Sequence, residues 1–338
     1  MKVFITRPIP EIGIKILRDK GYEVLINERA QNRPADKDEI MNNIKGVDAL
    51  FSTLTEKIDG EIMDKGLPSL KIIANMAVGF DNIDLDAAKQ RHIAVANTPG
   101  VLTDTVAEHT FALMLSISRR IVEADKFARA GLYSAWGPML LLGSDLSGKT
   151  LGVVGLGRIG SRVAYHAAKG FGMKVLYTDV KKNPEFEKEL LVEGSVPPKA
   201  GSGIAVGAQY FENIDDMLGR CDYVSLHVPL LDSTRHLIDE KRLKLMKTSA
   251  YLINTSRGPI IDEKALALGL SKGWIRGAAI DVFENEPKIE PGLLKLNNII
   301  LTPHIASATE ETRNAMAELA AKNIIEALEG RTPSNLIK

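Results

Sequence analysis

Three short segments in the last third of the chain each place a polar reactive side chain beside turn-forming residues. They are Asn254-Thr255-Ser256-Arg257-Gly258, Asp281-Val282-Phe283-Glu284-Asn285-Glu286-Pro287 and Thr302-Pro303-His304-Ile305-Ala306-Ser307. Ligands bind at the carboxyl ends of the strands in an open α/β sheet, and each segment follows a strand-like apolar run. Arg257, Glu286 and His304 are therefore expected where chemistry occurs, as an anion-binding cation, an acidic group and a proton-transfer group.

A glycine-rich turn after the apolar run at residues 150–155 has the pattern of a dinucleotide-binding loop. Gly155 permits the tight turn, Gly157 lets the backbone approach a pyrophosphate, and Gly160 lets helix and strand pack closely. The following helix would offer free N–H groups and a partial positive charge to the phosphates. Strand, loop, helix and second strand all occur in order, which favours a dinucleotide site over a simple tight turn.

Asp179, at the end of that second strand, indicates which dinucleotide binds. Its carboxylate is expected to accept hydrogen bonds from the adenosine ribose hydroxyls. A carboxylate repels the 2′-phosphate of NADP, so NAD is favoured and NADP is less favoured, although Lys181 and Lys182 partly offset the preference.

The elements that would position these groups alternate as in an α/β protein. Strands are expected at residues 2–6, 22–26, 49–51, 71–75 and 92–96, then at 150–155, 173–178, 223–228, 250–255, 277–281 and 298–303. Helical patterns lie between them, including one long apolar helix over 103–130 and a final helix over 310–328. The sequence predicts two doubly wound parallel sheets, of which the first lacks a glycine loop because its opening strand runs into Arg7-Pro8-Ile9-Pro10.

Composition and charge exclude several classes of protein. The 338 residues exceed what one core usually serves, which predicts two domains. Lys plus Arg and Asp plus Glu both total 43, so the basic excess typical of a nucleic-acid binder is missing. The single cysteine, Cys221, is expected to be a small buried hydrophobe. With neither a signal-peptide pattern nor a membrane-spanning apolar run, the expected location is the cytoplasm, with no membrane partner.

At these residues the sequence resembles the D-2-hydroxyacid dehydrogenase family, and within it most of all the glyoxylate and hydroxypyruvate reductases. The resemblance covers nearly the whole chain and adds four segments to those above: NMAVGFDNID at 75–84, NTPGVLTDTVAEHTFALML at 97–115, LSGKTLGVVGLGRIG at 146–160 and HVPL at 227–230. It implies a Rossmann-type NAD-binding and dimerisation domain over 100–303, and a flavodoxin-like substrate domain over 1–99 and 304–338. The implied activity is reversible, NAD-dependent reduction of glyoxylate or hydroxypyruvate to the 2-hydroxy acid.

The resemblance also implies a role for each reactive group. Arg257 matches the arginine that binds the substrate carboxylate, for which its planar fork is suited. His304 matches the general acid that protonates the developing alkoxide, and it also lies beside the cofactor. Glu286 matches the partner that orients the imidazole and favours its protonated form.

Other contacts follow from the resemblance position by position. Leu54 and the backbone of Val78 and Gly79 are implied to face the substrate, together with Trp136 of the partner subunit in a homodimer. The implied cofactor contacts, besides the three glycines and Asp179, are Thr105, Arg158, Ile159, His227, Val228, Pro229, Thr234, Thr255 and Asp281. No metal is expected.

Residues 183–209 depart from the family pattern, and we expect a surface excursion there near the adenosine side. Two alternative functions remain open at this point. Phosphoglycerate dehydrogenases share the Arg, Glu and His, and so do the C-terminal-binding-protein corepressors, which sense NAD without acting as metabolic enzymes. Turnover of a small 2-oxo acid with NADH separates the enzyme from the sensor.

Overall fold

A computed structural model of the protein describes residues 1–31, 33–191 and 207–337. The chain divides into two compact units, Met1–Leu102 with Ala308–Lys338, and Thr103–Ser307. The boundaries predicted from the sequence, after residues 99 and 303, differ from these by a few residues. At the second boundary the backbone N–H groups of Ile305 and Ala306 donate to the Asp281 carboxylate at 2.9 and 2.8 Å, which ties this segment to the second unit.

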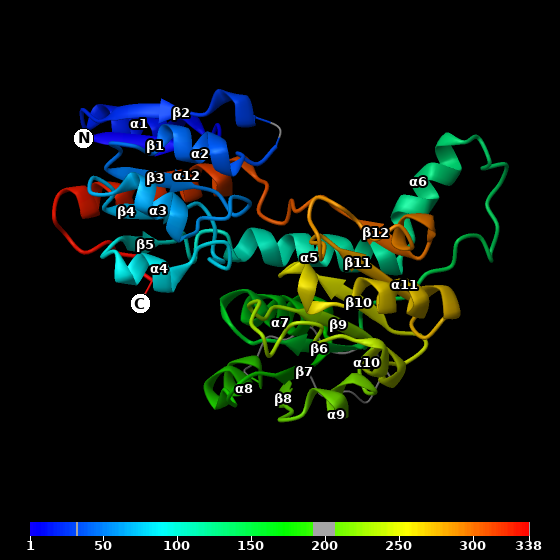
Figure 1. Ribbon diagram of the computed structural model, residues 1–338. Helices are drawn as coiled ribbons and strands as arrows, with labels where there is room; N and C mark the ends of the chain where they lie inside the picture. Colours follow the sequence, from blue (N-terminus) through cyan, green and yellow to red (C-terminus); the bar gives the residue numbers. More distant parts are fainter. Residues whose placement is uncertain (32, 192–206, 338) are drawn as a thin grey trace. The chain divides into compact units, whose positions relative to one another are not determined.

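The first unit is a five-stranded parallel sheet covered by helices on both faces, with strand order β2-β1-β3-β4-β5 (Figure 1). Alternate side chains such as Phe4, Leu50 and Ile73 pack against one set of helices, because neighbouring residues of a strand face opposite ways. The strands are β1 (Lys2–Ile5), β2 (Glu23–Ile26), β3 (Ala49–Ser52), β4 (Ile72–Asn75) and β5 (Ala94–Ala96). The helices are α1 (Glu11–Asp19), α2 (Lys37–Asn43), α3 (Gly60–Gly66), α4 (Leu85–Gln90) and α12 (Glu310–Leu328).

The second unit is a seven-stranded parallel sheet with strand order β12-β11-β10-β9-β6-β7-β8, again with two helical layers. The order reverses at β6, which makes its carboxyl end a topological switch point. The strands are β6 (Thr150–Val154), β7 (Lys174–Thr178), β8 (Ala208–Tyr210), β9 (Tyr223–Leu226), β10 (Tyr251–Asn254), β11 (Gly277–Ile280) and β12 (Ile299–Leu301). The helices are α5 (Thr103–Ser118), α6 (Ile121–Arg129), α7 (Arg158–Phe171), α8 (Pro184–Leu191), α9 (Ile214–Leu218), α10 (Glu240–Leu245) and α11 (Glu263–Lys272). The predicted fold class is confirmed.

The prediction of one continuous helix over residues 103–130 is wrong, because the structure has two helices there, α5 and α6. Arg120 adopts a left-handed conformation with φ 55° between the two helices. The carbonyl of Ser118 accepts a hydrogen bond from the N–H of Ser144 at 2.8 Å, and a Cβ at Gly143 would overlap that carbonyl. In a continuous helix the carbonyl of Ser118 would accept from the N–H four residues later in the chain. Here the returning segment at Ser144 occupies that carbonyl instead.

The excursion expected over residues 183–209 is only partly a loop. Its first part forms α8, and its last residues form the edge strand β8, which pairs with β7. The hydroxyl of Tyr177 in β7 donates to Glu187 and accepts from the N–H of Asn183, which anchors the helix to the sheet. Residues 192–206 of the predicted excursion lie outside the described residues.

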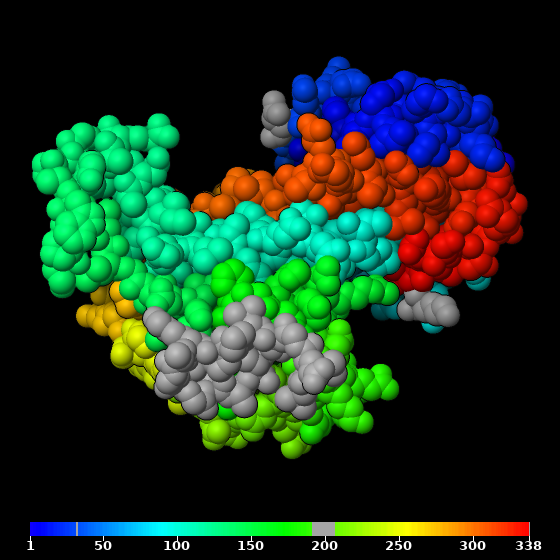
Figure 2. All heavy atoms as spheres, turned by 180° about the vertical axis from the view of Figure 1, so that it is seen from behind, coloured from blue at the N-terminus to red at the C-terminus, as the bar shows by residue number. Residues whose placement is uncertain are grey.

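An apolar arm, defined as residues 121–143, follows the break and carries no buried residue in its helix α6. Figure 2 shows this segment projecting from the rest of the second unit. Its large apolar side chains are exposed, with Trp136 at 79 %. Exposed apolar side chains gathered on one segment are typical of an interaction face. None of the helices in the described part of the chain is long and apolar enough to cross a membrane.

Candidate active site

Six strands of the second unit end in register along one edge of the sheet. The paired positions at that edge are Leu301, Ile280, Asn254, Leu226, Val154 and Thr178. The residues that come next in the chain are therefore neighbours, and they are Thr302, Asp281, Thr255, His227, Gly155 and Asp179. The register brings most of the predicted site segments to the carboxyl edge that α/β proteins use for ligands.

The glycine loop has the geometry that a pyrophosphate site needs. Gly155 has φ 92°, and a Cβ there would lie 2.8 Å from the carbonyl of His227. A Cβ at Gly160 would overlap the carbonyl oxygen of Gly155, whereas nothing lies within 4 Å of the Cβ position at Gly157. Helix α7 begins at Arg158, so its unsatisfied first-turn N–H groups and positive dipole end adjoin the open side of Gly157. These residues fit the diphosphate of a dinucleotide.

Asp179, the predicted ribose contact, also holds this loop. One carboxylate oxygen accepts from the N–H of Leu156 at 2.5 Å, and the other accepts from the N–H of Val180 at 2.6 Å. Each carboxylate oxygen has a second lone pair, so both can still accept a hydroxyl. The sequence indicated the ribose contact but not the bond to the glycine loop.

His304 and Glu286 form the pair that the sequence predicted. Nδ1 of His304 lies 3.0 Å from Oε2 of Glu286, and Oε1 of Glu286 accepts from the N–H of Phe283 at 3.0 Å. A carboxylate only accepts, so Nδ1 carries a proton and Nε2 is the atom available for proton transfer. The imidazole is 23 % exposed, which leaves it accessible to a small molecule.

Asp281 is fully buried and organises the segment that presents His304. Its carboxylate accepts from the hydroxyl of Thr302 at 2.7 Å and from the N–H groups of Ile305 and Ala306. Its backbone carbonyl accepts from the N–H of His304 at 2.8 Å, where the chain takes the left-handed φ of 55°. Burial alone raises the pKa of the Asp281 carboxyl, but its hydrogen bonds, first that with His109, hold the pKa below its usual value.

Arg257 and Glu286 lie on segments whose backbones are in direct contact. A Cβ at Gly258 would overlap the carbonyl of Phe283 and crowd the N–H of Glu284, so only glycine fits between them. Asn254 donates to the carbonyl of Arg257 at 2.9 Å and so holds the turn closed. The two charged residues are thus fixed to one another through the main chain.

Three other histidines of the second unit, His227, His166 and His236, are not paired with Glu286. Part of His227 reaches the surface, but desolvation of its imidazole lowers the pKa of His227 to about 3, and Nε2 lies 2.8 Å from the hydroxyl of Ser225. His227 is therefore neutral at physiological pH. Burial also lowers the pKa of His166, and His236 lies 2.7 Å from a carboxylate oxygen of Glu284. No group of three His, Cys, Asp or Glu side chains in the described residues could hold a metal ion.

The remaining predicted contacts occupy loops and helix starts. The hydroxyl of Thr234 donates to the carbonyl of Pro229 at 2.7 Å, and that of Thr255 lies 3.0 Å from the hydroxyl of Thr110. Both hydroxyls are therefore already hydrogen-bonded within the second unit. The following residues are at least partly exposed: Leu54 after β3, Val78 and Gly79 after β4, Thr105 in α5, Arg158 and Ile159 in α7, and Val228 and Pro229 after β9.

Two residues of the site were not singled out as functional from the sequence. His109 on α5 is 18 % exposed and places Nε2 3.5 Å from a carboxylate oxygen of Asp281. Glu263 on α11 is 3 % exposed, and its carboxylate accepts from the N–H groups of Glu284 and Glu290 at 2.7 and 3.3 Å. Burial raises the pKa of Glu263. An ordinary first-turn glutamate gives no sequence signal for such burial.

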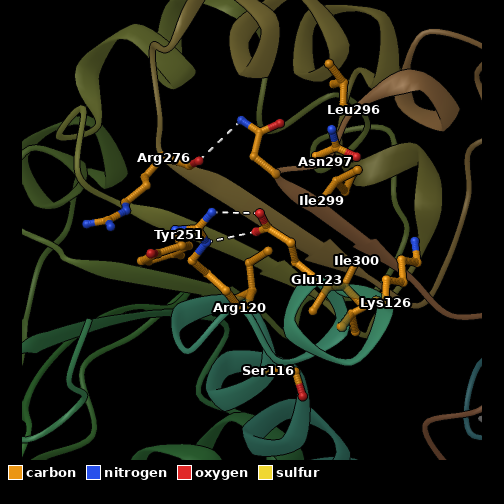
Figure 3. A pocket seen from close by; sticks show the side chains of 13 residues that line it. Ser116, Arg120, Glu123, Lys126, Tyr251, Arg276, Leu296, Asn297, Ile299 and Ile300 are labelled. Carbon is orange, nitrogen blue, oxygen red and sulfur yellow. Dashed lines mark hydrogen bonds and ion pairs between the residues drawn. The ribbon is translucent and has the colours of Figure 1, made fainter. Parts of the chain in front are cut away.

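A pocket of about 330 Å³ in the second unit lies at the opposite edge of the sheet (Figure 3). It is lined by Arg120 and Glu123, which form an ion pair at 2.7 Å, and by Tyr251, Arg276 and Asn298 at the amino ends of the strands. None of the predicted site residues lines it. Its position at the base of the apolar arm separates it from the proton-transfer pair.

Comparison with known proteins agrees with this geometry. Residues 111–306 match the family model described as D-isomer specific 2-hydroxyacid dehydrogenase, NAD binding domain. A curated glyoxylate reductase of Thermococcus litoralis is 48 % identical, over 99 % of this chain and 96 % of the relative. A crystal structure of a protein from Thermus thermophilus has a TM-score of 0.88 and 40 % identity, covering 100 % of both chains. A structure of an NADPH-dependent glyoxylate/hydroxypyruvate reductase from Sinorhizobium meliloti, in complex with NADP and malonate, has a TM-score of 0.82 and 31 % identity over 99 % of this chain and 96 % of its own.

Proposed function

Since the chain belongs to the D-isomer specific 2-hydroxyacid dehydrogenase family, we propose that it reduces glyoxylate, and also hydroxypyruvate, to the 2-hydroxy acid. The observation that carries this proposal is the His304–Glu286 pair at the same strand edge as the glycine loop. A proton donor beside a dinucleotide site is what reduction of a ketone or aldehyde requires.

Each residue of the triad would act on a different part of the substrate. Arg257 would bind the carboxylate and polarise the carbonyl, because its guanidinium presents two parallel N–H donors. His304 would give the proton on Nε2 to the carbonyl oxygen as negative charge develops there, while Glu286 holds Nδ1–H and stabilises the imidazolium. The bound nicotinamide supplies the hydride.

Oxidation of NADH and NADPH, followed by absorbance with a set of 2-oxo acids, tests the proposal. The set contains glyoxylate, hydroxypyruvate, pyruvate, phosphohydroxypyruvate and a larger branched 2-oxo acid. We expect the highest kcat/KM with glyoxylate or hydroxypyruvate. A preference for phosphohydroxypyruvate would make the protein a phosphoglycerate dehydrogenase, and absence of turnover with every acid would contradict an enzymatic role.

The carboxylate of Asp179 favours NADH over NADPH, because it would lie against the 2′-phosphate of NADP. We expect the Asp179→Ser variant to narrow this preference. It should also weaken binding of both cofactors, since the N–H of Leu156 loses its acceptor. Fluorescence titration with each cofactor measures both effects, with Asp216→Ser on the exposed side of α9 as the control. A wild-type protein that binds NADPH more tightly would contradict the assignment.

The apolar arm supports a homodimer in which this face is covered by a second copy. Dimerisation would remove the exposed apolar side chains of the arm from water, which is favourable in free energy. In such a dimer Trp136 of the partner subunit would limit the space beside the substrate's third carbon.

Trp136→Ala is expected to leave the dimer intact and to raise activity on larger 2-oxo acids relative to glyoxylate. The physical reason is the removal of a rigid ring that restricts the substrate side chain. Sedimentation and the substrate set are measured on the same variant, with Met139→Ala, also exposed on the arm, as the control. Dissociation of the dimer, or an unchanged order of substrates, would give Trp136 a purely structural role.

The chemistry of the cysteine supports a cytoplasmic location for this enzyme. Cys221 is the only cysteine of the chain, and burial raises the pKa of its thiol to about 12. A protein without disulfides is suited to a reducing compartment.

A further inference from the structure

The loop after β4 has three successive carbonyl groups held by hydrogen bonds. The carbonyl of Ala77 accepts from the N–H of Thr98 at 2.8 Å. The carbonyl of Val78 accepts from Nδ2 of Asn97 at 2.7 Å, and that of Gly79 accepts from Nδ2 of Asn75 at 3.0 Å. Two of the three donors are therefore side-chain amides, which a substitution can remove.

Holding these carbonyls fixes the direction of three N–H groups. The carbonyl of one residue and the N–H of the next belong to one planar peptide and point in opposite directions when the peptide is trans, as all three are here. The N–H groups of Val78, Gly79 and Phe80 therefore point away from the donors. In residues 1–31, 33–191 and 207–337 no group accepts a hydrogen bond from any of them. Successive backbone N–H groups that are left unpaired in a bend of the chain can form an anion-binding concavity.

Asn75 is itself held rigidly, because all of its side-chain groups are bonded. It is fully buried, accepts from the hydroxyl of Ser52 at 3.1 Å and donates its second N–H to Oδ1 of Asn82 at 3.1 Å. Asn82 donates in turn to the carbonyls of Thr53 and Glu56 at 3.0 and 2.9 Å. This chain of amides joins the loop after β4 to the loop after β3.

Asn97 is anchored through its backbone to the last helix and the C-terminal segment. Its carbonyl accepts from Nδ2 of Asn323 in α12 at 3.0 Å, and its N–H donates to the carbonyl of Asn335 at 3.3 Å. The side chain that holds Val78 thus extends from a fixed point of the first unit.

We propose that Asn97 and Asn75 are positioning residues for the carboxylate of the substrate. They hold the carbonyls of Val78 and Gly79 so that the N–H groups of this loop stay aimed at one anion. The inference rests on the proposed function, because it takes the anion to be the carboxylate of a 2-oxo acid. Neither asparagine touches that carboxylate, so removing either one acts through the loop.

The test is the Asn97→Ala variant of the full-length protein, assayed with glyoxylate and saturating cofactor. We expect KM for glyoxylate to rise about tenfold and kcat to change by less than twofold, because the carboxylate contact is the same in ground and transition states. The Kd of the cofactor should be unchanged, since its glycine loop lies in the other unit. Asn97→Ser, whose side chain is too short to reach the Val78 carbonyl, should behave alike.

Asn43→Ala is the matched control, because Asn43 also donates Nδ2 to a backbone carbonyl of the first unit, that of Glu39 at 2.7 Å. Its KM should equal that of the wild type. An unchanged KM in both Asn97 variants overturns the inference, and so does an equal rise in Asn43→Ala. The proposed function is judged separately, by wild-type turnover of glyoxylate. If the wild type shows no turnover, binding of the anion oxamate is measured by calorimetry instead. The inference then requires that Asn97→Ala bind oxamate more weakly than the wild type does.

Discussion

His304→Ala is expected to lower kcat by about 10²–10⁴-fold, the usual contribution of a general acid. The variant lacks the only imidazole that the structure pairs with Glu286 in the described residues, and His227 cannot replace it because it stays neutral at physiological pH. Cofactor affinity should remain close to that of the wild type, since the glycine loop is unaltered. Single-turnover kinetics and a fluorescence titration measure the two quantities.

The control is His92→Ala, because His92 is exposed and also has a left-handed φ of 55°. Replacing His92 by alanine has the same cost in backbone free energy at a positive φ, but it removes no side chain of the site. If His92→Ala loses as much activity as His304→Ala, the loss at His304 reflects backbone strain and not proton transfer.

Glu286→Gln tests the same pair by removing the charge of the carboxylate. A glutamine amide can still accept from Nδ1 of His304, but it stabilises an imidazolium less than a carboxylate does, so we expect kcat to fall. The Kd of the cofactor should stay close to that of the wild type. Steady-state kinetics and fluorescence titration measure the two quantities, and an unchanged kcat would remove Glu286 from the mechanism.

Gly258→Ala should reduce kcat/KM by at least about 10²-fold, because displacement of catalytic groups by an ångström has effects of that size. The added Cβ would overlap the carbonyl of Phe283, so the backbones that carry Arg257 and Glu286 must separate. Overpacking of this kind costs roughly 1–3 kcal/mol in the free energy of unfolding. Chemical denaturation and steady-state kinetics measure the two effects.

Gly170→Ala provides the matched control for this substitution. A Cβ at Gly170, inside α7, meets nothing within 4 Å, so alanine there should leave activity unchanged and slightly stabilise the helix. Retention of full activity by Gly258→Ala would show that the two segments can move apart without consequence for the chemistry.

The parts of this protein that local rules govern could be predicted from its sequence. The positive φ of Gly155 and the close approach of Gly160 to the Gly155 carbonyl are constraints within one strand, loop and helix. The predicted family and fold class are confirmed. The short edge strand β8 was missed because three residues after a Gly- and Ala-rich stretch give little periodicity.

What could not be predicted depends on contacts between distant parts of the chain. The break at Arg120 is fixed by a carbonyl that bonds to Ser144, and the bond of Asp179 to Leu156 joins the ends of two strands. His109 approaches Asp281 only because α5 packs on the sheet. The sequence shows the chemistry available to each of these side chains, but which groups lie beside them is determined by tertiary packing.

The proposed recognition of an anion by main-chain N–H groups would have a consequence for how this enzyme can evolve. Every residue except proline carries an N–H group, so substitutions at Val78 or Phe80 leave the donors in place. Changes in the side chains around the loop can alter which 2-oxo acid fits while the demand for a carboxylate persists. With the proposed roles, single substitutions could change which 2-oxo acid is preferred, whereas losing the requirement for a carboxylate would take changes in Arg257 or in the asparagines that hold the loop.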